Sequence, residues 1–381
     1  MISIVRDHIF TVEEREKFVN NLKATPSEYQ SNSYSIIYNS TIISTTLSSA
    51  LTKTSSRTIS ASTIKTITTT TSTKTTTTTT LTTVNWDSNN FTNIKTLRGH
   101  IQVVSCILVL KNGLIVSGDW KNDILIWNVN FSLEKEINNG WTKYGVSTIE
   151  EINDGYLLTA SGDKTIKKWN STYHLIDSVN SLNYVIYSLL YINASRVVVG
   201  GTEGILHILN TNDLHTKFNF SGEGHTKTVN KIILLFSGNL ATASEDKTIR
   251  VWNLNTMSLL FKLKGHNDSV LAMVQLKNGN LATGSLDKSI IVWDIIKKSI
   301  IYTLNNHTDA VSSLILLKNG DLVSGSWDHT IVIWDMSKKS VKQILKGHQA
   351  GIFPMVQLNN GDFLTGSWDC MIKIWSRRKS L

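Results

Sequence analysis

A repeat of roughly forty residues runs through most of the chain and constrains its fold more than any other feature. Its marker is a tryptophan that closes a short apolar run, replaced once by leucine. Steps of 42, 40, 43, 41, 41 and 41 residues separate the seven closing positions, Trp127, Trp169, Leu209, Trp252, Trp293, Trp334 and Trp375. Units of this kind bury their apolar faces against one another. The sequence therefore predicts seven copies of one supersecondary unit.

The copy from Gly265 to Asp294 shows what one unit contains. Its sequence, GHNDSVLAMVQLKNGNLATGSLDKSIIVWD, holds three short apolar runs separated by turn-forming residues. Such runs are typical of β-strands. Their apolarity is continuous rather than alternating, which indicates strands that are covered on both faces. A fourth kind of run lies between copies, just before the Gly-His pair; residues 259–264, for example, precede Gly265. Each copy therefore predicts a four-stranded sheet, with strands a to d, stacked between similar sheets.

The Gly-His opening, the Asp in the second turn and the closing Trp-Asp resemble the signature of the WD-repeat (β-transducin-like) family, across residues 91–381. The resemblance implies an all-β, seven-bladed propeller of four-stranded antiparallel blades around a central channel. The seventh copy ends on its third strand, Met371 to Trp375. An unpaired apolar edge promotes aggregation. We predict that Ile94 to Leu97, a spare d strand ahead of the first Gly-His, pairs there and closes the ring.

Four polar residues recur at fixed spacing in the last four copies: a His, a Ser or Thr, an Asp and the closing Trp. Ser, His and Asp also form hydrolase triads, but a catalytic set occurs once, whereas this set occurs four times. The resemblance implies structural tetrads, in which Asp orients His, His reaches the hydroxyl and the hydroxyl meets the indole N–H. Their members are His225, Thr242, Asp246 and Trp252; His266, Thr283, Asp287 and Trp293; His307, Ser324, Asp328 and Trp334; and His348, Thr365, Asp369 and Trp375.

The first three copies depart from this pattern. The first has Lys121 in place of the Asp, the second has Thr142 in place of the His, and the third retains only the acidic Glu203. A buried network that lacks a member leaves its other members unpaired. We therefore expect blades 1 to 3 to form the looser side of the ring.

The resemblance also places partner contacts on the top face, where the d-to-a and b-to-c turns open. The contact positions lie three and five residues after the His and just before the turn Asp. Aromatic residues there are enriched at protein interfaces, although each Trp could instead pack on its own turn. None of these positions is Arg, which argues against a phosphopeptide ligand. The candidate partner-binding residues are Trp120, Tyr187, Trp327, Phe353 and Trp368.

The opposite, bottom face is rich in lysine, and the whole chain carries a formal net charge of +9. This charge suggests an alternative partner, nucleic acid or acidic lipid. Lysines in turns also serve solubility. The basic residues assigned to this face are Lys111, Lys277, Lys297, Lys298, Lys318, Lys338, Lys339, Arg377, Arg378 and Lys379.

The sequence holds no Cys/His zinc spacing, phosphate-binding loop or dinucleotide fingerprint, so we expect no metal, no cofactor and no enzymatic activity. An enzyme with a site at the channel mouth is the less favoured alternative. The two cysteines are Cys106, which we expect in the core, and Cys370. So few cysteines favour a reducing compartment, the cytoplasm or alternatively the nucleus. No apolar run is long enough to span a membrane.

The first 90 residues differ from the repeats. Thr11 to Leu22 has a helix-capping pattern and a short apolar stripe, which predicts a helical segment within residues 1–30. Residues 31–90 are rich in Ser and Thr, a composition typical of a disordered linker. We expect the whole chain to act as a non-enzymatic interaction scaffold or adaptor, a monomeric propeller within an intracellular multiprotein complex.

Overall fold

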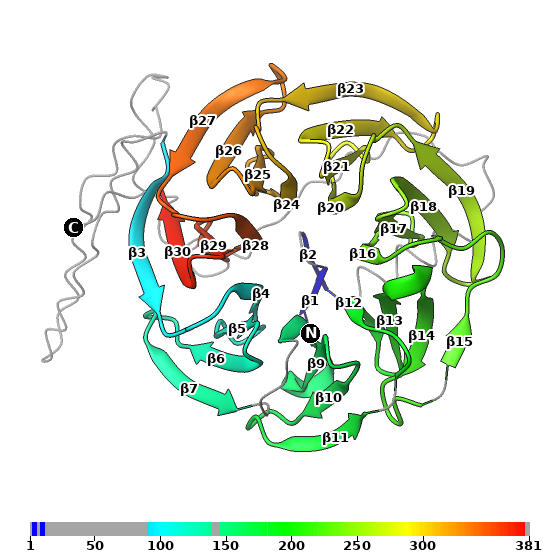
Figure 1. Cartoon of the computed structure of the whole chain (residues 1–381), viewed down its shortest axis with the longest axis vertical. Coiled ribbons are helices and arrows are strands. Elements are labelled where there is room, and N and C mark those ends of the chain that lie inside the picture. The colour runs from blue at the N-terminus through cyan, green and yellow to red at the C-terminus, as the bar shows by residue number, and fades with distance from the viewer. Residues whose placement is uncertain are drawn as a thin grey trace, which may run out of the picture. The chain divides into compact units, whose positions relative to one another are not determined.

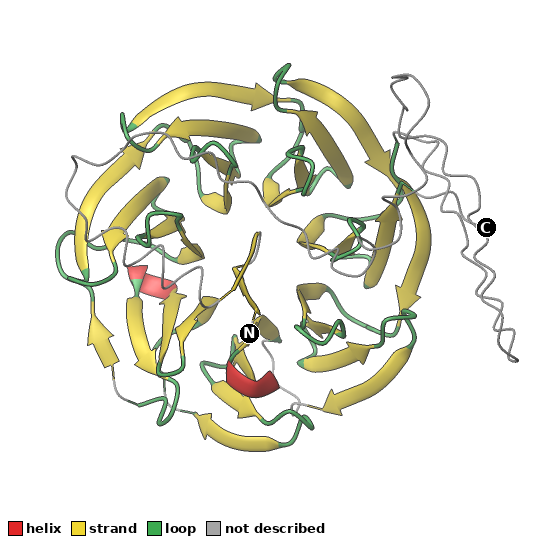
Figure 2. Ribbon diagram, turned by 180° about the vertical axis from the view of Figure 1, so that it is seen from behind, coloured by secondary structure: helices red, strands yellow, loops and turns green. Residues whose placement is uncertain are grey.

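The computed structural model describes residues 2–5, 8–11, 90–138, 145–180, 182–215 and 217–377. The described residues from 90 to 377 form seven four-stranded antiparallel sheets arranged in a ring (Figure 1). Seen from behind, the described chain is almost entirely strand and turn (Figure 2). A separate hairpin joins β1 (Ile2–Val5) to β2 (His8–Thr11). The all-β, seven-bladed architecture expected from the repeat is confirmed.

The seven sheets are numbered as blades in chain order. Blade 1 contains β4 (Val104–Val109), β5 (Ile115–Asp119), β6 (Asp123–Trp127) and β7 (Leu133–Asn138). Blade 2 contains β8 (Val146–Glu151), β9 (Leu157–Ser161), β10 (Ile166–Trp169) and β11 (Leu175–Val179). Blade 3 contains β12 (Ile186–Asn193), β13 (Arg196–Gly201), β14 (Leu206–Asn210) and β15 (Lys217–Asn219). Blade 4 contains β16 (Val229–Leu234), β17 (Leu240–Ser244), β18 (Thr248–Asn253) and β19 (Ser258–Lys264).

The remaining three blades follow the same order. Blade 5 contains β20 (Val270–Gln275), β21 (Leu281–Ser285), β22 (Ser289–Asp294) and β23 (Ser299–Asn305). Blade 6 contains β24 (Val311–Leu316), β25 (Leu322–Ser326), β26 (Thr330–Asp335) and β27 (Ser340–Lys346). Blade 7 contains β28 (Ile352–Gln357), β29 (Phe363–Ser367), β30 (Met371–Ser376) and, from the start of the ring, β3 (Thr92–Arg98). Two single-turn 3₁₀ helices, η1 (Asn153–Gly155) and η2 (Thr202–Gly204), lie in turns.

The ring closes through β3, as the sequence predicts. β3 pairs antiparallel with β30, and Leu97 lies opposite Ile372. A contact that the sequence did not reveal strengthens this closure: the backbone N–H of Phe91 donates to Oε1 of Gln343 in blade 6 at 2.8 Å, and Nε2 of Gln343 donates back to the carbonyl of Phe91 at 2.8 Å. The closing strand is therefore joined both to its own blade and to the blade before it.

Seven apolar clusters form the core, and each joins two successive blades. In the cluster that joins blade 7 to blade 1, Leu97 and Leu364 pack with Val104 and Trp127. Six of the seven b strands are buried along their whole length, and the seventh, β13, is buried apart from Arg196. The d strands are largely exposed at the rim, as in β23. Stacking covers both faces of each sheet, which accounts for the continuous apolar runs.

The predictions for the first 90 residues lie almost wholly outside the described residues. Thr11, the expected start of a helix, is the last residue of β2. The rest of that helix, and the linker as far as residue 89, stay predictions, as do the placements of Thr142, Arg378 and Lys379.

Candidate interaction surface and structural tetrads

The tetrad residues of blades 4 to 7 meet in one repeated arrangement. In blade 5, Nδ1 of His266 lies 2.8 Å from Oδ2 of Asp287, and Nε2 of His266 lies 2.7 Å from Oγ1 of Thr283. The indole N–H of Trp293 donates to the same hydroxyl at 2.8 Å. Because the ionised carboxylate of Asp287 only accepts, Nδ1 of His266 carries the proton and donates to it, and in the neutral imidazole Nε2 then accepts from the Thr283 hydroxyl. The set is a closed structural chain without a free nucleophile.

The tetrad aspartates are held ionised by their hydrogen bonds. Burial alone would raise the pKa of the Asp287 carboxyl. Hydrogen bonds from His266, from the Ser289 hydroxyl and from the backbone N–H of Asn267 outweigh burial and hold that pKa well below its usual range. The carboxyl pKa is lowered in the same way in the other three tetrads, at Asp246, Asp328 and Asp369.

These lowered pKa values predict a loss of stability in acid. A carboxyl whose pKa is lower in the folded state stabilises the protein above its unfolded pKa of about 4, and that stability is lost as the pH falls toward the folded pKa. We expect the free energy of unfolding, measured by urea denaturation, to fall steeply below pH 4. In Asp287→Asn, the free energy of unfolding should fall less steeply with decreasing pH, by at most about 1.4 kcal/mol per pH unit. Asp268→Asn, an exposed acid of the same blade, is the control, and equal slopes in the two variants would contradict the assignment.

Blade 1 has a complete tetrad, which the sequence analysis missed. Asp119 supplies the carboxylate from two positions before Lys121: its Oδ2 lies 3.0 Å from Nδ1 of His100. Nε2 of His100 lies 2.6 Å from Oγ of Ser117, which accepts the Trp127 indole N–H at 2.8 Å. The sequence feature that could have revealed this tetrad is Asp119 in the stretch SGDWKND, at a position where blades 4 to 7 have a Ser.

Blade 3 replaces the tetrad with apolar residues. Leu182, Val199 and Leu209 occupy the positions of the His, the hydroxyl residue and the Trp, and all three are buried in one cluster. Glu203, at the Asp position, is exposed, so replacing the three buried polar members together leaves none of them unsatisfied. In blade 2 the Trp169 indole N–H still donates to Thr159 Oγ1 at 3.0 Å. The physical reason for expecting looser packing on the side of blades 1 to 3 therefore does not hold for blades 1 and 3.

Three of the five candidate partner-binding residues come together on the top face. The ring centroids of Trp327 and Trp368 are 5.1 Å apart, and those of Trp368 and Trp120 are 6.3 Å apart. We call Trp120, Trp327 and Trp368 the tryptophan patch; it spans blades 1, 6 and 7, which are consecutive around the ring (Figure 1). Trp120 is 48% exposed and Trp368 is 36% exposed. The indole nitrogen of Trp327 is buried without a hydrogen-bond partner among the described residues.

The backbone of the patch is held in place by a bond that recurs in every blade. The N–H of Trp120 donates to the carbonyl of Val103 at 3.1 Å, and the N–H of Trp368 donates to that of Gly351 at 3.0 Å. Gly351 also makes room for Trp327, because a Cβ at this glycine would lie 3.3 Å from Cδ1 of that indole. The corresponding donors of blades 2 to 6 are Gly162, Thr202, Glu245, Leu286 and Trp327. The patch is therefore carried by a rigid frame.

The other two candidates lie apart from the patch or inside the ring. Tyr187 is exposed, but it belongs to β12 of blade 3. Phe353 is partly buried in β28 of blade 7. In four of the other blades this a-strand position holds the ring together, because its side chain donates to a carbonyl of the next blade. These donors and acceptors are Ser105 with Val146, Ser147 with Ile186, Asn230 with Val270, and Ser312 with Ile352.

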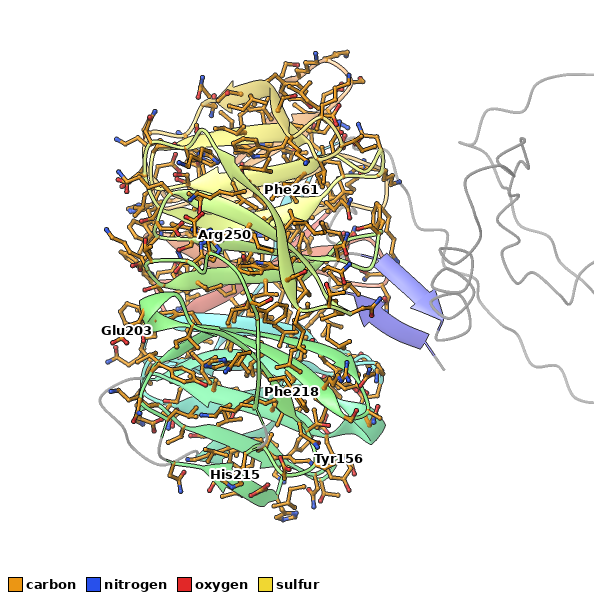
Figure 3. The ribbon with its side chains drawn as sticks, turned by 90° about the vertical axis from the view of Figure 1, so that its right-hand side faces the viewer. Tyr156, Glu203, His215, Phe218, Arg250 and Phe261 are labelled. Atoms are coloured by element: carbon orange, nitrogen blue, oxygen red, sulfur yellow. The ribbon has the colours of Figure 1, made fainter. Side chains whose placement is uncertain are left out.

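Most of the bottom-face lysines that the structure describes have local partners. Glu203 of a b-to-c turn and Tyr156 of an a-to-b turn lie toward opposite faces in the edge-on view (Figure 3). On the Tyr156 side, the Lys318 ammonium donates to the carbonyl of Asn359 at 2.6 Å, and that of Lys339 lies 4.7 Å from the ring centroid of Tyr302. Lysines engaged in this way gain less from an anionic partner, so no specific observation favours nucleic acid or lipid.

Other chemistry is not indicated in the part of the chain that the structure describes. Within it, no group of three or more His, Cys, Asp or Glu residues is placed to hold a metal ion. No helix in that part is both long and apolar enough to cross a membrane. Cys106 is buried in β4, and Cys370 is partly exposed in a b-to-c turn.

The closed ring of seven blades defines a β-propeller of the class that generally serves as a protein-interaction scaffold. Comparison with known families agrees: the family described as WD domain, G-beta repeat, matches residues 91–128, 216–253, 257–294, 298–335 and 339–376. The chain belongs to the WD-repeat family. The crystal structure of the WD40 β-propeller domain of Doa1 is similar in fold, with a TM-score of 0.67 and 22% identity over 76% of this chain and 98% of that one.

Curated relatives are similar over shorter stretches. Mitochondrial division protein 1 of Candida glabrata is 27% identical over 180 residues, which are 45% of this chain and 23% of that protein. The WD repeat-containing protein 55 homolog of Dictyostelium discoideum is 25% identical over 42% of this chain and 39% of its own length. Autophagy-related protein 16 of Arabidopsis thaliana is 23% identical over 47% of this chain and 36% of its own length. The matches thus span less than half the length of each of these relatives.

Proposed function

We propose that this protein is a non-enzymatic adaptor in an intracellular multiprotein complex and that it binds a protein or peptide partner through the tryptophan patch. The observation that carries the proposal is the contact of three indoles from three successive blades on one face. Trp is enriched among residues that dominate binding energy at protein interfaces. A site held on a rigid frame loses little conformational entropy on binding.

The polar residues that could suggest catalysis are engaged in hydrogen bonds with one another. In blade 6, His307 and Ser324 are bonded to each other at 2.7 Å, and the Ser324 hydroxyl also accepts the Trp334 indole N–H at 2.8 Å. The same arrangement in five blades supports a structural role. We therefore infer a binding protein rather than a hydrolase, one whose ligand lies against the patch.

Affinity purification from cell extract tests this proposal. The bait is the intact chain, and the variant carries Trp327→Ala with Trp368→Ala. We expect bound partners to fall by about tenfold or more, since each truncated anchor costs more than about 1 kcal/mol. Leu286→Ala, at the equivalent turn position of blade 5, is the control and should retain its partners. The proposal fails if the tryptophan variant melts like the parent protein and captures the same proteins in the same amounts.

A further inference from the structure

A second feature of the top face lies away from the tryptophan patch, at the rim of blade 4 beside blade 5. It is a hollow of about 310 Å³, lined by side chains from both blades. Four cations face two carboxylates there, so the lining carries an excess of positive charge. The charged residues are Lys247, Arg250, Lys262 and Lys264, with Glu223 and Asp246.

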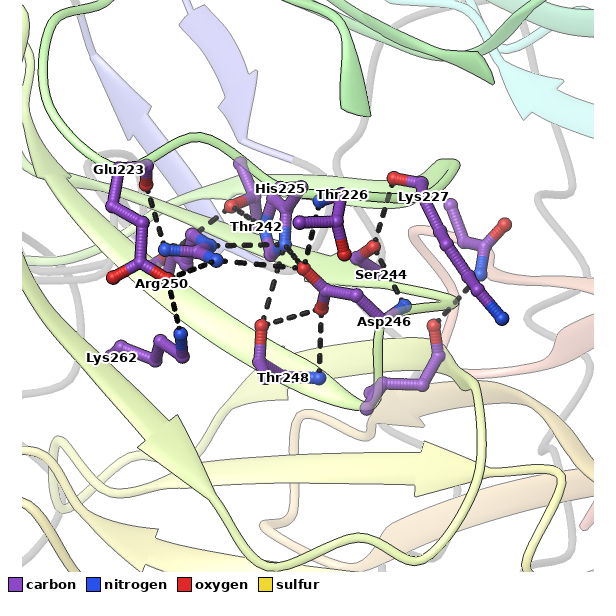
Figure 4. Close-up of polar contacts among 12 residues, drawn as sticks. Glu223, His225, Thr226, Lys227, Thr242, Ser244, Asp246, Thr248, Arg250 and Lys262 are labelled. Atoms are coloured by element: carbon purple, nitrogen blue, oxygen red, sulfur yellow. Dashed lines mark hydrogen bonds and ion pairs between the residues drawn. The ribbon is translucent and has the colours of Figure 1, made fainter. Parts of the chain in front are cut away.

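Arg250 is the buried centre of this hollow. Its side chain is 1% exposed, and a buried guanidinium is costly unless it is paired. One terminal nitrogen donates to the carbonyl of Glu223 at 2.7 Å; the other donates to Oε1 of Glu223 at 3.3 Å and lies 3.6 Å from Oδ2 of Asp246 (Figure 4). The Nε of Arg250 is 3.3 Å from Nδ1 of His225. Nδ1 of His225 already donates its proton to Asp246 at 2.8 Å. It therefore cannot accept from Nε of Arg250, and the two nitrogens are in contact without a hydrogen bond.

The two carboxylates differ in how firmly they are held. Asp246 is bound by His225, by the N–H of Thr226 at 3.2 Å, and by the N–H and hydroxyl of Thr248 at 3.0 and 2.5 Å. Glu223 is 64% exposed and lies between Gly222 and Gly224. Gly222 has a φ of +103°, and a Cβ at Gly224 would meet nothing within 4 Å. Only the Glu223 carboxylate can leave the hollow without breaking a tetrad.

Glu223 is also an exception among the repeats. It stands two residues before the blade 4 histidine, where blades 1, 5 and 7 have Arg98, Lys264 and Lys346. Its Oε1 lies 2.6 Å from Nζ of Lys262 as well as 3.3 Å from Arg250. This carboxylate occupies the place that an external oxyanion would take. Lys264 lines the same hollow and has no ion-pair partner among the described residues.

We propose that this hollow binds the oxyanion of an acidic peptide segment, a carboxylate or a phosphate, and that Glu223 is an internal competitor which the ligand displaces. The incoming group keeps Arg250 paired and gains Lys262 and Lys264, the kind of charge-assisted recognition for which Arg is suited. The absence of arginine, which disfavours a phosphopeptide ligand, holds only for the top-face contact positions. Arg250 lies on β18, outside those positions, and this site is independent of the tryptophan patch.

The test follows the Arg250 side chain directly. In the full chain labelled with ¹⁵N, the Nε–Hε signal of Arg250 is assigned as the one absent from Arg250→Lys. Inorganic phosphate and acetate are titrated separately at constant ionic strength. We expect a saturable shift, and Glu223→Gln should bind about tenfold more tightly because the competitor's charge is removed. Glu245→Gln, which removes the same charge from the neighbouring b-to-c turn, is the matched control and should bind like the parent.

The outcomes separate the proposal from general electrostatics. Lys264→Gln changes an exposed side chain and should weaken binding severalfold in a protein that melts normally. Tighter binding of phosphate than of acetate indicates a phosphorylated segment as the ligand. Equal affinity for the two anions indicates Asp or Glu side chains. If Glu223→Gln and Glu245→Gln raise the affinity for the anion equally, the bound group is an adventitious ion only and the proposed site is overturned. The same conclusion follows if Lys264→Gln leaves the affinity unchanged.

Discussion

A chain that lacks residues 91–98 is expected to melt at least about 10 °C below the intact protein. Those residues supply β3, the outer strand of blade 7, and bury Phe91 to 3% and Leu97 to 4% exposure. Truncating one buried Phe or Leu costs about 2 to 5 kcal/mol, and both are lost here together with a whole ladder of backbone hydrogen bonds. The bare edge of β30 should also make the shortened protein aggregate.

Circular dichroism melting and size-exclusion chromatography measure the two effects. Phe91→Ala with Leu97→Ala tests the same closure without shortening the chain and should lower the melting temperature in the same direction. Thr92→Ala, an exposed position of the same strand, is the control and should melt like the parent. An unchanged melting temperature after the deletion would show that another segment closes the ring.

Asp119→Asn should destabilise the protein by about 3 to 5 kcal/mol, because it breaks a buried, hydrogen-bonded pair on one side only. The carboxylate of Asp119 binds His100 and also accepts the backbone N–H groups of Lys121 and Asp123 at 2.9 and 3.0 Å. Lys121 itself forms a partly exposed ion pair with Asp123 at 3.2 Å. Lys121→Ala should therefore change stability by less than about 1 kcal/mol.

Urea denaturation of both variants shows whether position 119 or position 121 supplies the carboxylate of the blade 1 tetrad. If alignment with the other repeats determined which residue acts, a change at position 121 would lower the free energy of unfolding and a change at position 119 would not. The structure predicts the reverse. The double variant Asp119→Ser with Lys121→Asp restores the arrangement of blades 4 to 7 and should recover most of the loss. Similar stabilities of Asp119→Asn and Lys121→Ala would show that the blade 1 tetrad contributes little.

The number of blades and the closing strand could be predicted because both follow from local pattern. Seven closing positions at nearly constant steps require seven equivalent units, and a last unit without a d strand requires a partner, which Ile94 to Leu97 provides. The tie between Phe91 and Gln343 could not be predicted, since these residues are 252 positions apart and belong to no repeated motif.

Within the tetrads, equivalent positions make equivalent contacts in blades 4 to 7, but in blades 1 and 3 they do not. The tetrad residues of these four blades meet as the resemblance to the WD-repeat family implies. In blade 1 the carboxylate comes from Asp119 instead of position 121, and in blade 3 a Leu, Val and Leu set replaces the polar one. Register alone cannot show that a neighbouring side chain reaches the same atom or that apolar residues fill the same volume.

The amino-acid sequence by itself determined the repeat, the strand pattern and the residue types at each turn, because strand propensity and apolar periodicity are local properties. Only the tertiary structure decided which distant side chains meet. Trp327, Trp368 and Trp120 form one patch because the ring brings its last blades beside its first. Glu223 reaches Arg250 because the d-to-a connection folds over blade 4. The contact among the three tryptophans depends on closure of the whole ring, which no single repeat encodes.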